Sequence, residues 1–370
     1  MKKYMKLFAC LLAGAFVLTA CSDDDSVKPI SYQDVPVADG LFILNEGSYF
    51  DQVNGSLDYL DYATGTVSRR VFQAANGRSL GGTPNNAIQC GSKIYIATQE
   101  ENRVEVIDAK TLKALSPIAI TAPRELCTDG RFVYVSAYTG EVSKVDTLSL
   151  KVVKKSPIVG TNLEGIAYRA GSVYVCNAWN SDYTYNTNVV KLNAETLAKE
   201  KDVTVAANPN QLIAAGQDLF LSSWGNYFDV PATIQRIDMS DNVTVIANAT
   251  YMAYYEDSLY LIGSFYDESW NEKNTYTVVD LKTNQETKFI DGTEIDSPCA
   301  IGVDPITGSV FISSRKKYPN ADGTESVSYK QDGYVVRYNY DGEYVGTYEC
   351  GVNPGTLLFV NHTKQVPVYE

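Results

Sequence analysis

Short apolar strand patterns recur along the chain and predict its fold. Each copy has an apolar residue, an aromatic residue and another apolar residue in succession, as in KIYIA (residues 93–97) and SVYVC (172–176). The copies lie roughly forty to fifty residues apart, a period typical of repeat architectures. Seven copies are present, and their aromatic residues are Phe42, Tyr95, Tyr134, Tyr174, Phe220, Tyr260 and Phe311.

A second strand follows each aromatic strand and ends in an Asp or Asn residue. An Asp or Asn side chain can hydrogen-bond to the backbone two residues further on and set a tight turn. We therefore assign these residues a structural role: Asp61, Asp108, Asp146, Asn193, Asp238, Asp280 and Asn339.

Another apolar run precedes each aromatic strand, so each repeat has four short strands and no helical periodicity. This predicts an all-β protein, a seven-bladed β-propeller with four-stranded antiparallel blades. The first aromatic strand, LFIL (41–44), lacks a preceding inner strand, and the last inner strand, NPGTLLFV (353–360), lacks a successor. We expect these N- and C-terminal strands to share one blade and close the ring without an open edge.

The first twenty residues have the pattern of an export signal. Lys2, Lys3 and Lys6 precede an apolar stretch of about a dozen residues, which is too short to span a bilayer. The segment LTAC (18–21) resembles a lipobox, so we expect lipidation at Cys21; the alternative is a soluble secreted protein. The expected organisation is a signal peptide (1–20), a lipidated cysteine with a flexible acidic tether (21–39), the propeller (40–362) and a C-terminal tail (363–370).

The acidic run and the net charge of the chain indicate where the protein is located and which partners it can bind. The acidic run SDDD (22–25) resembles a surface-export signal of Gram-negative gut bacteria, which predicts a lipoprotein of the outer membrane facing the exterior. Removing the three signal lysines takes the formal net charge from −13 to −16. A field of this sign repels nucleic acid and suits a neutral or cationic ligand.

Residues suited to catalysis or metal binding are few. The single histidine, His362, lies near the C-terminus, and the cysteines have no CxxC spacing. Neither a histidine-based triad nor a zinc site is therefore expected. The loop NADG (320–323) could hold calcium, although an ordinary Asp-Gly turn is the commoner reading. We expect no cofactor and no enzymatic activity; a hydrolase built on Glu164 or Asp267 is the alternative.

Long loops connect the second and third strands of the blades, at residues 45–54, 99–102, 137–140, 177–188, 223–232, 264–274 and 314–331. They hold all three tryptophans and many tyrosines, among Asn, Asp and Glu. Some of these tyrosines can simply pack on neighbouring loops. Rigid aromatic and amide side chains on one propeller face nevertheless predict a ligand-binding bowl. The candidate ligand-binding residues are Tyr49, Asn85, Asn86, Arg124, Tyr138, Asn162, Glu164, Trp179, Tyr183, Asn210, Trp224, Asn226, Tyr227, Tyr251, Tyr266, Trp270 and Arg315.

The repeats are similar to those of YncE-like and DUF5074-type seven-bladed propellers over about residues 40–361. Three segments, GLFILNEG (40–47), NPNQ (208–211) and SSWGNY (222–227), together with the lipobox and the acidic run, resemble the BtuG family of surface cobalamin-binding lipoproteins. This resemblance implies capture of a corrinoid and its delivery to a TonB-dependent outer-membrane transporter. It assigns no individual contact residue.

The residues and the family resemblance are compatible with several functions. The first is non-enzymatic capture of a corrinoid, which is a wide, nearly neutral disc edged with amides. The second is capture of another nutrient, such as a glycan or a metal chelate, because tryptophan surfaces also suit sugars. The others are a hydrolase or lyase on the same face and a propeller scaffold for protein partners.

Overall fold

The computed structural model describes residues 30–266, 272–290, 295–321 and 323–369. It divides into two units: Pro36–His362, and a smaller unit that includes residues 30–35 and 363–369. Cys21, the acidic run and Trp270 lie outside the described residues.

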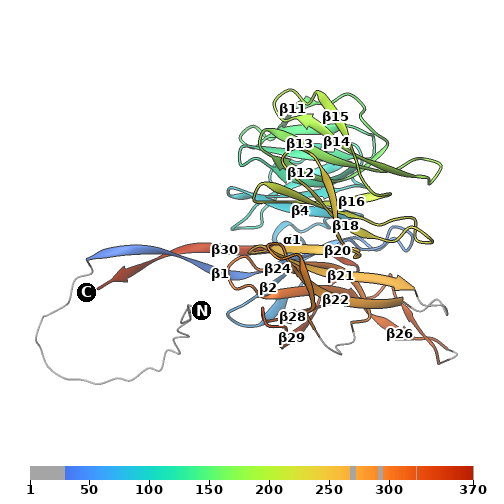
Figure 1. Ribbon diagram of the computed structural model, residues 1–370. Helices are drawn as coiled ribbons and strands as arrows, with labels where there is room; N and C mark the ends of the chain where they lie inside the picture. Colours follow the sequence, from blue (N-terminus) through green and yellow to red (C-terminus); the bar gives the residue numbers. More distant parts are fainter. Residues whose placement is uncertain (1–29, 267–271, 291–294, 322, 370) are drawn as a thin grey trace, which may run out of the picture. The chain divides into compact units, whose positions relative to one another are not determined.

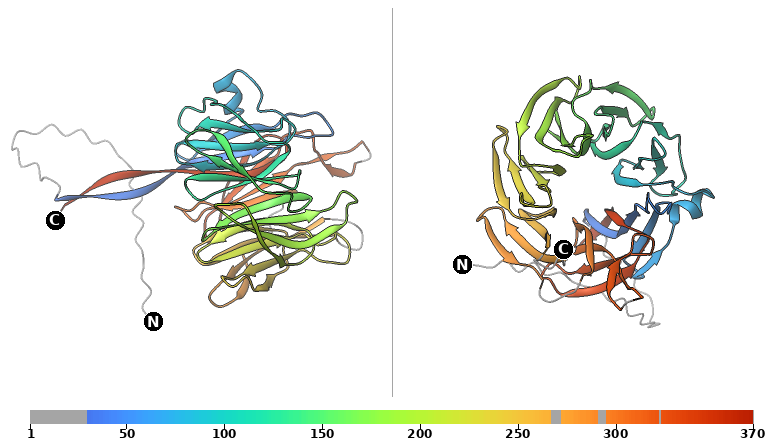
Figure 2. Two further views of the ribbon diagram at one scale, coloured as in Figure 1. Left: turned by 90° about the horizontal axis from the view of Figure 1, so that it is seen from above. Right: turned by 90° about the vertical axis from the view of Figure 1, so that its right-hand side faces the viewer.

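Seven four-stranded antiparallel sheets form the larger unit and are arranged in a ring (Figure 2). Five blades take four successive strands each. They are β4 (Pro84–Cys90), β5 (Lys93–Thr98), β6 (Arg103–Asp108) and β7 (Ile118–Ala119); β8 (Pro123–Thr128), β9 (Phe132–Ala137), β10 (Val142–Asp146) and β11 (Lys151–Lys155); β12 (Asn162–Arg169), β13 (Ser172–Trp179), β14 (Tyr185–Asn193) and β15 (Lys199–Thr204); β16 (Pro209–Ala215), β17 (Asp218–Ser223), β18 (Thr233–Ile237) and β19 (Val243–Ala247); and β20 (Tyr251–Tyr255), β21 (Ser258–Tyr266), β22 (Glu272–Asp280) and β23 (Gln285–Lys288).

The sixth blade contains an insertion. Its strands are β24 (Ser297–Val303), β25 (Val310–Arg315), β28 (Tyr334–Tyr338) and β29 (Tyr344–Glu349). The hairpin of β26 (Lys317–Pro319) and β27 (Glu325–Val327) lies between β25 and β28 in the chain. The prediction of an irregular loop over residues 314–331 is therefore wrong for this segment, which pairs as a hairpin.

The seventh blade closes the ring as predicted (Figure 1). It has the order β3-β2-β1-β30, so that β30 (Pro354–Val368) pairs with β1 (Ser31–Asn45), followed by β2 (Ser56–Asp61) and β3 (Thr66–Ser68). Three strands from the start of the propeller are thus completed by one from its end. Pairing both sides of β1 removes the free edge that an open ring would expose.

The recurring aromatic residues are buried in the interfaces between blades. All seven lie on the second strand of their blades and are at most 5% exposed. Tyr95, for example, packs with Val133 and Val135 of the next blade. Because each aromatic side chain fills a space between two sheets, the core is distributed around the ring in several clusters.

The seven acidic and amide turn residues have the predicted structural role. In each, the side-chain oxygen accepts a hydrogen bond from a backbone N–H two or three residues further on. These hydrogen bonds favour the carboxylate form and help to lower the pKa of Asp108, Asp146, Asp238 and Asp280.

Four features differ from the sequence-based expectation. A short helix, α1 (Val71–Asn76), follows β3; its six residues bury only Phe72, so no helical period is visible. Strand β1 begins at Ser31, inside the segment expected to be a flexible tether, and β30 continues to Val368, inside the expected tail. His362 therefore lies within a strand, where its side chain is 52% exposed and hydrogen-bonds to Asp39. Strands β13, β14, β21 and β22 shorten two of the expected long loops.

Over the ranges that the structure describes, no helix has the length and apolar character required to cross a membrane.

The closing blade gives a stability prediction. Phe311 is fully buried, and its ring lies 5.7 Å from that of Tyr62 and 5.6 Å from that of Phe359, on the two chain ends that meet in this blade. We expect Phe311→Ala to lower the free energy of unfolding by about 3–5 kcal/mol, because it leaves a cavity. Phe50→Ala, at a side chain 92% exposed, should change it by less than about 0.5 kcal/mol in the same urea titration. Equal losses in the two variants would contradict this packing role.

Candidate functional site

Irregularities at the starts of the inner strands place polar side chains around the centre of the ring. The strand register shifts after Pro84 in β4, Pro123 in β8, Pro209 in β16 and Pro298 in β24, and also within β12. Such bulges leave residues unpaired and redirect their side chains. The residues left out of the pairing are Asn85, Arg124, Glu125, Glu164, Gly165, Asn210 and Cys299, and all but Gly165 line one cavity.

This cavity, which we call the channel mouth, has a volume of 710 Å³. Every blade contributes to its wall, including the closing blade through Glu46, Asn353 and Thr356. A site of this kind depends on closure of the ring, since its residues come from strands far apart in the chain.

An ion pair occupies one side of the channel mouth. The Arg124 guanidinium donates to Glu164 at 3.0 Å and to the Gln99 side chain at 2.8 Å. The Tyr138 hydroxyl donates to the other oxygen of Glu164 at 2.5 Å, and its ring lies 4.5 Å from the guanidinium carbon. Burial, reinforced by the charge of Glu164, raises the pKa of Tyr138, so this hydroxyl remains a donor. These contacts fix Arg124 and Glu164 as a pair.

Two further carboxyl groups in the same cavity titrate near neutrality. Burial raises the pKa of Glu46 to about 7, against the opposing charges of Arg124 and Arg315. Burial likewise raises the pKa of Glu125 to about 8, where Arg124 opposes the shift while Glu164 and Glu46 add to it. The channel mouth therefore holds more carboxyl groups than guanidinium groups, and two of these carboxyls exchange protons near pH 7.

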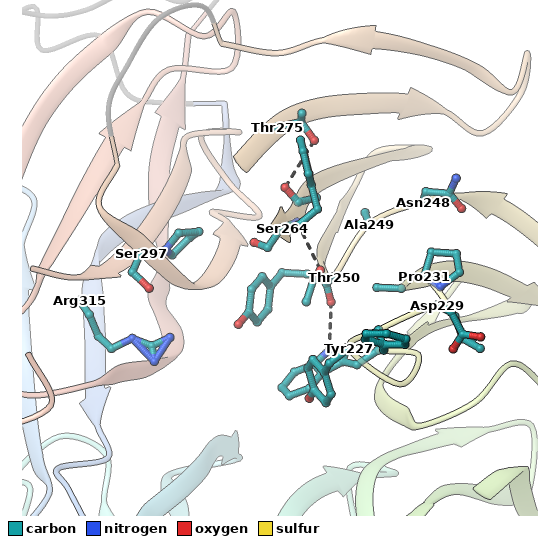
Figure 3. A pocket seen from close by; sticks show the side chains of 18 of the residues that line it. Tyr227, Asp229, Pro231, Asn248, Ala249, Thr250, Ser264, Thr275, Ser297 and Arg315 are labelled. Atoms are coloured by element: carbon teal, nitrogen blue, oxygen red, sulfur yellow. Dashed lines mark hydrogen bonds between the residues drawn. The ribbon is translucent and has the colours of Figure 1, made fainter. Parts of the chain in front are cut away.

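A second, more aromatic cavity of 880 Å³ adjoins the channel mouth (Figure 3). We call it the aromatic cavity. The Trp224 indole donates to the Thr250 carbonyl at 3.1 Å and meets the Tyr251 ring edge to face at 5.9 Å. Figure 3 shows Ser297 and Arg315 across the cavity from Tyr227 and Thr250. The two cavities share four wall residues, Trp224, Tyr251, Arg315 and Tyr329.

Many of the candidate residues from the sequence line these cavities. In one or both lie Asn85, Asn86, Arg124, Tyr138, Glu164, Asn210, Trp224, Tyr227, Tyr251 and Arg315. The structure thus brings together side chains from loops and strand starts that are far apart in sequence.

Five candidate residues line neither cavity, because each is engaged elsewhere or faces solvent. Trp179 packs between Tyr138 and Tyr183, and Tyr183 itself is 78% exposed. Asn162 donates to the Trp179 carbonyl. The other two are Asn226, whose side chain bonds within its own loop, and Tyr49, which is exposed beside Phe50. Trp270 and the side chain of Tyr266 lie outside the described residues.

Several residues that line the channel mouth were not among the candidate ligand-binding residues. They are Glu46, Glu125, Cys299, Asn353 and Tyr329. A sequence signal for some of these residues is the proline that begins most inner strands. The residues directly beside this proline line the channel mouth. This proline position points to Cys299 and Asn353, but not to Glu46 or Tyr329.

Within the described ranges, no group of three or more His, Cys, Asp or Glu side chains is arranged to hold a metal ion. Asp322, in the loop that could hold calcium, lies outside those ranges. Asp267, a candidate residue of the alternative hydrolase, lies outside them as well.

Comparison with known proteins gives a family and a fold. The sequence profile of a family described as a domain of unknown function, DUF5074, matches residues 39–350. No curated protein matches the sequence significantly.

Solved structures share the fold at low sequence identity. A quinonprotein alcohol dehydrogenase-like protein from Bacteroides thetaiotaomicron has a TM-score of 0.63 and 15% identity, over 87% of this chain and 78% of that one. Hydrazine synthase from Kuenenia stuttgartiensis has a TM-score of 0.59 and 15% identity, over 77% and 95%. Apo AztD from Citrobacter koseri has a TM-score of 0.54 and 10% identity, over 90% and 99%. At these identities the likeness concerns the fold alone.

The raised pKa of Glu125 gives a pH-dependence prediction. A carboxyl group with a folded-state pKa near 8, against its ordinary 4.5, binds its proton more tightly in the folded protein. Its contribution to stability is full below pH 4.5 and is lost as the pH rises through about 8. Relative to Glu125→Gln, the unsubstituted protein should lose on the order of 1–2 kcal/mol of unfolding free energy between pH 5 and 9.

Urea titrations at pH 5, 7 and 9 measure this difference. Glu195→Gln serves as the matched control, because Glu195 is exposed in the turn between β14 and β15. This variant should keep the pH dependence of the unsubstituted protein. If Glu125→Gln shows the same pH dependence of the unfolding free energy as the unsubstituted protein, the prediction is wrong and the Glu125 carboxyl is ionised from pH 5 to 9.

Proposed function

The chain belongs to the DUF5074 family, and from this premise and the paired cavities we propose that it captures a corrinoid, such as cobalamin, without chemical turnover. The observation that carries the proposal is the wall shared by the two cavities. Trp224, Tyr251, Arg315 and Tyr329 border both, so that a broad flat ligand can extend over these residues into each side. A corrinoid requires such a surface because it is a wide ring edged with amides.

The size of the two cavities supports a ligand larger than a single metabolite. Pockets of about 300–1,000 Å³ each enclose a drug-sized ligand, and the two cavities measure 880 and 710 Å³. Their walls also differ in character: Phe228, Phe265 and Pro231 line the aromatic cavity, whereas amides and carboxyls line the channel mouth. A ligand with an apolar ring and polar arms complements this division.

We propose that the protein is anchored in the outer membrane through a lipid on Cys21, faces the exterior and passes its ligand to a TonB-dependent transporter. The lipobox-like LTAC segment and the acidic run behind it support the anchor and its direction. The resemblance to BtuG-type lipoproteins in three segments of the propeller supports the transporter partner.

A second candidate is a carboxylate-based hydrolase or lyase on the same face. The pKa values of Glu46 and Glu125, about 7 and about 8, favour it because general acids and bases work best near the ambient pH. Glu164, the residue first considered for this role, is held in its ion pair with Arg124. Capture and turnover differ in whether the ligand is recovered unchanged.

Calorimetric titration with cyanocobalamin tests the capture proposal. We expect one-to-one binding that Trp224→Ala weakens at least about tenfold, equivalent to about 1.4 kcal/mol, because the indole borders both cavities. Phe50→Ala is the control, since that ring is 92% exposed and lines neither cavity, and it should change affinity less than about threefold. The bound ligand should be recovered with unchanged mass. Absence of binding at high protein concentration would contradict corrinoid capture.

Metabolic labelling with a radioactive fatty acid tests the anchor. The unsubstituted chain should incorporate label and sediment with membranes, whereas Cys21→Ala should lose both properties, because the lipid attaches to that thiol. Protease treatment of intact cells should remove the propeller if the lipoprotein faces outward. Survival of the propeller in intact cells, with cleavage after lysis, would place it on the inner side.

A further inference from the structure

The channel mouth contains hydrogen-bond acceptors for which the described residues supply no donor. The side-chain oxygens of Asn85, Asn86 and Asn353 are buried without a hydrogen-bond partner, and all three residues line this cavity. Asn85 is only 6% exposed. The orientation of Asn353 follows from its other end, because its amide nitrogen donates to the Gly47 carbonyl at 2.5 Å. Unpaired buried acceptors are costly, so their presence together indicates a ligand that donates to them.

The carboxyl groups add to this excess of acceptors. From the described residues, neither the Glu46 nor the Glu125 carboxyl receives a hydrogen bond, although Arg124 acts on both electrostatically and Arg315 acts on Glu46. The Arg124 donors are directed to Glu164 and Gln99. The Arg315 guanidinium lies 5.1 Å from the centre of the Tyr329 ring at the border with the aromatic cavity. The three unpaired amide oxygens and the three carboxyl groups of the channel mouth therefore outnumber its two guanidinium groups.

We propose that the channel mouth is a subsite for nitrogen-borne hydrogen-bond donors, a primary amide or ammonium group of the ligand, and that above neutral pH it disfavours carboxylates. The inference rests on the proposed function in one respect: it assumes that this face of the propeller binds a ligand. Beyond the proposed function, it specifies which functional groups of the ligand the channel mouth binds. An arm of the ligand would enter the channel mouth while its flat part lies against Trp224 and Tyr251.

Electrostatics favours donors over anions more strongly as the pH rises. Glu46 faces Arg124, Arg315 and Glu164, and Glu125 faces Arg124, Glu164 and Glu46. With all three carboxyls ionised, they outnumber the two guanidinium groups, and the cavity is negative. Protonation of Glu46 and Glu125 at lower pH reverses this balance. An anionic group thus meets repulsion above about pH 8 that it escapes near pH 6.

Cys299 supplies a reporter in the wall of this cavity. Its thiol is half-buried on β24 and lines the channel mouth, whereas Cys90, Cys176 and Cys350 are buried. Iodoacetamide and iodoacetate alkylate a thiol with the same leaving group, and they differ only in carrying a primary amide or a carboxylate. The ratio of their rates at one pH cancels the thiolate fraction. Peptide mass spectrometry of the full chain separates reaction at Cys299 from reaction at other cysteines.

At pH 8 we expect iodoacetamide to be favoured over iodoacetate at Cys299 by at least tenfold, relative to the ratio for the urea-unfolded chain. The preference should be smaller at pH 6, because Glu46 and Glu125 are then protonated. Glu46→Gln and Glu125→Gln should each reduce it severalfold at pH 8. Glu195→Gln removes the same charge from an exposed position and should leave the preference unchanged, which separates the local effect from the net charge of the protein.

Three results would overturn the proposal: a relative ratio near one, the same loss of preference in Glu195→Gln as in the two cavity variants, or no alkylation of Cys299 by either reagent. The last would show that small amides do not reach the channel mouth. The experiment contains no corrinoid, so failure of cyanocobalamin to bind leaves the subsite intact, and failure of the subsite leaves corrinoid capture to be judged by calorimetry.

Discussion

Pairing of β30 with β1 is the constraint on which the rest of the structure depends. It joins the two ends of the propeller: the Asn353 amide donates to the Gly47 carbonyl, 306 residues away, and the Gly351 N–H donates to the buried Asp58 carboxylate, 293 residues away. Asp58 also accepts from Asn45 and Arg69. Contacts within one stretch of chain can form the other six blades, but only these long-range contacts complete the seventh and make the sheets a ring. The channel mouth exists only in the ring, because all seven blades contribute to its wall.

A conflict between strand pairing and ligand access is resolved at the start of five of the inner strands. A regular strand would hydrogen-bond every residue to its neighbour and alternate its side chains. Proline at Pro84, Pro123 and Pro209 removes one donor, and the residue before each has a positive φ, between 46° and 61°. The register then shifts by one or two residues. The resulting bulges turn polar side chains toward the channel while the remainder of each strand keeps its regular pairing.

The sequence was sufficient for the fold because the fold is repeated. An aromatic residue such as Tyr95 or Phe311 occurs in every blade for the same packing reason, and a turn residue such as Asp108 caps the same turn each time. Repetition therefore supplied the blade count and the closure. The site breaks the repeat, since the bulges carry side chains of different kinds: Asn85 and Asn210 are amides, Arg124 carries a guanidinium and Cys299 a thiol. The candidate residues Asn85, Arg124 and Asn210 lie at these bulges, whereas the repeat does not identify Cys299.

Aromatic composition was a weaker guide to the site than backbone geometry. Trp179 and Trp224 occupy similar places in neighbouring blades, yet only Trp224 borders the cavities, because Trp179 packs between two tyrosines. Strands β13 and β14 extend through much of the expected loop and fix Trp179 by pairing it with Tyr185. Loop composition does not reveal which aromatic side chain packs against its own neighbours and which one remains available to line a cavity. Hydrophobic pattern and turn chemistry define the scaffold, whereas the cavity depends on strand register.

The half-buried carboxyl groups of Glu46 and Glu125 then take on a specific meaning. In a chain with a net charge of −13, exposed acids are ordinary, and nothing in the sequence distinguishes Glu46 or Glu125 from the others. Their environment does, because burial raises the pKa of each toward neutrality although Arg124 opposes both shifts and Arg315 also opposes that of Glu46. A fold that needed only stability would replace such groups with apolar side chains, since buried charge that is incompletely paired is costly. Their position at the meeting point of all seven blades is better explained by a ligand that supplies the missing donors.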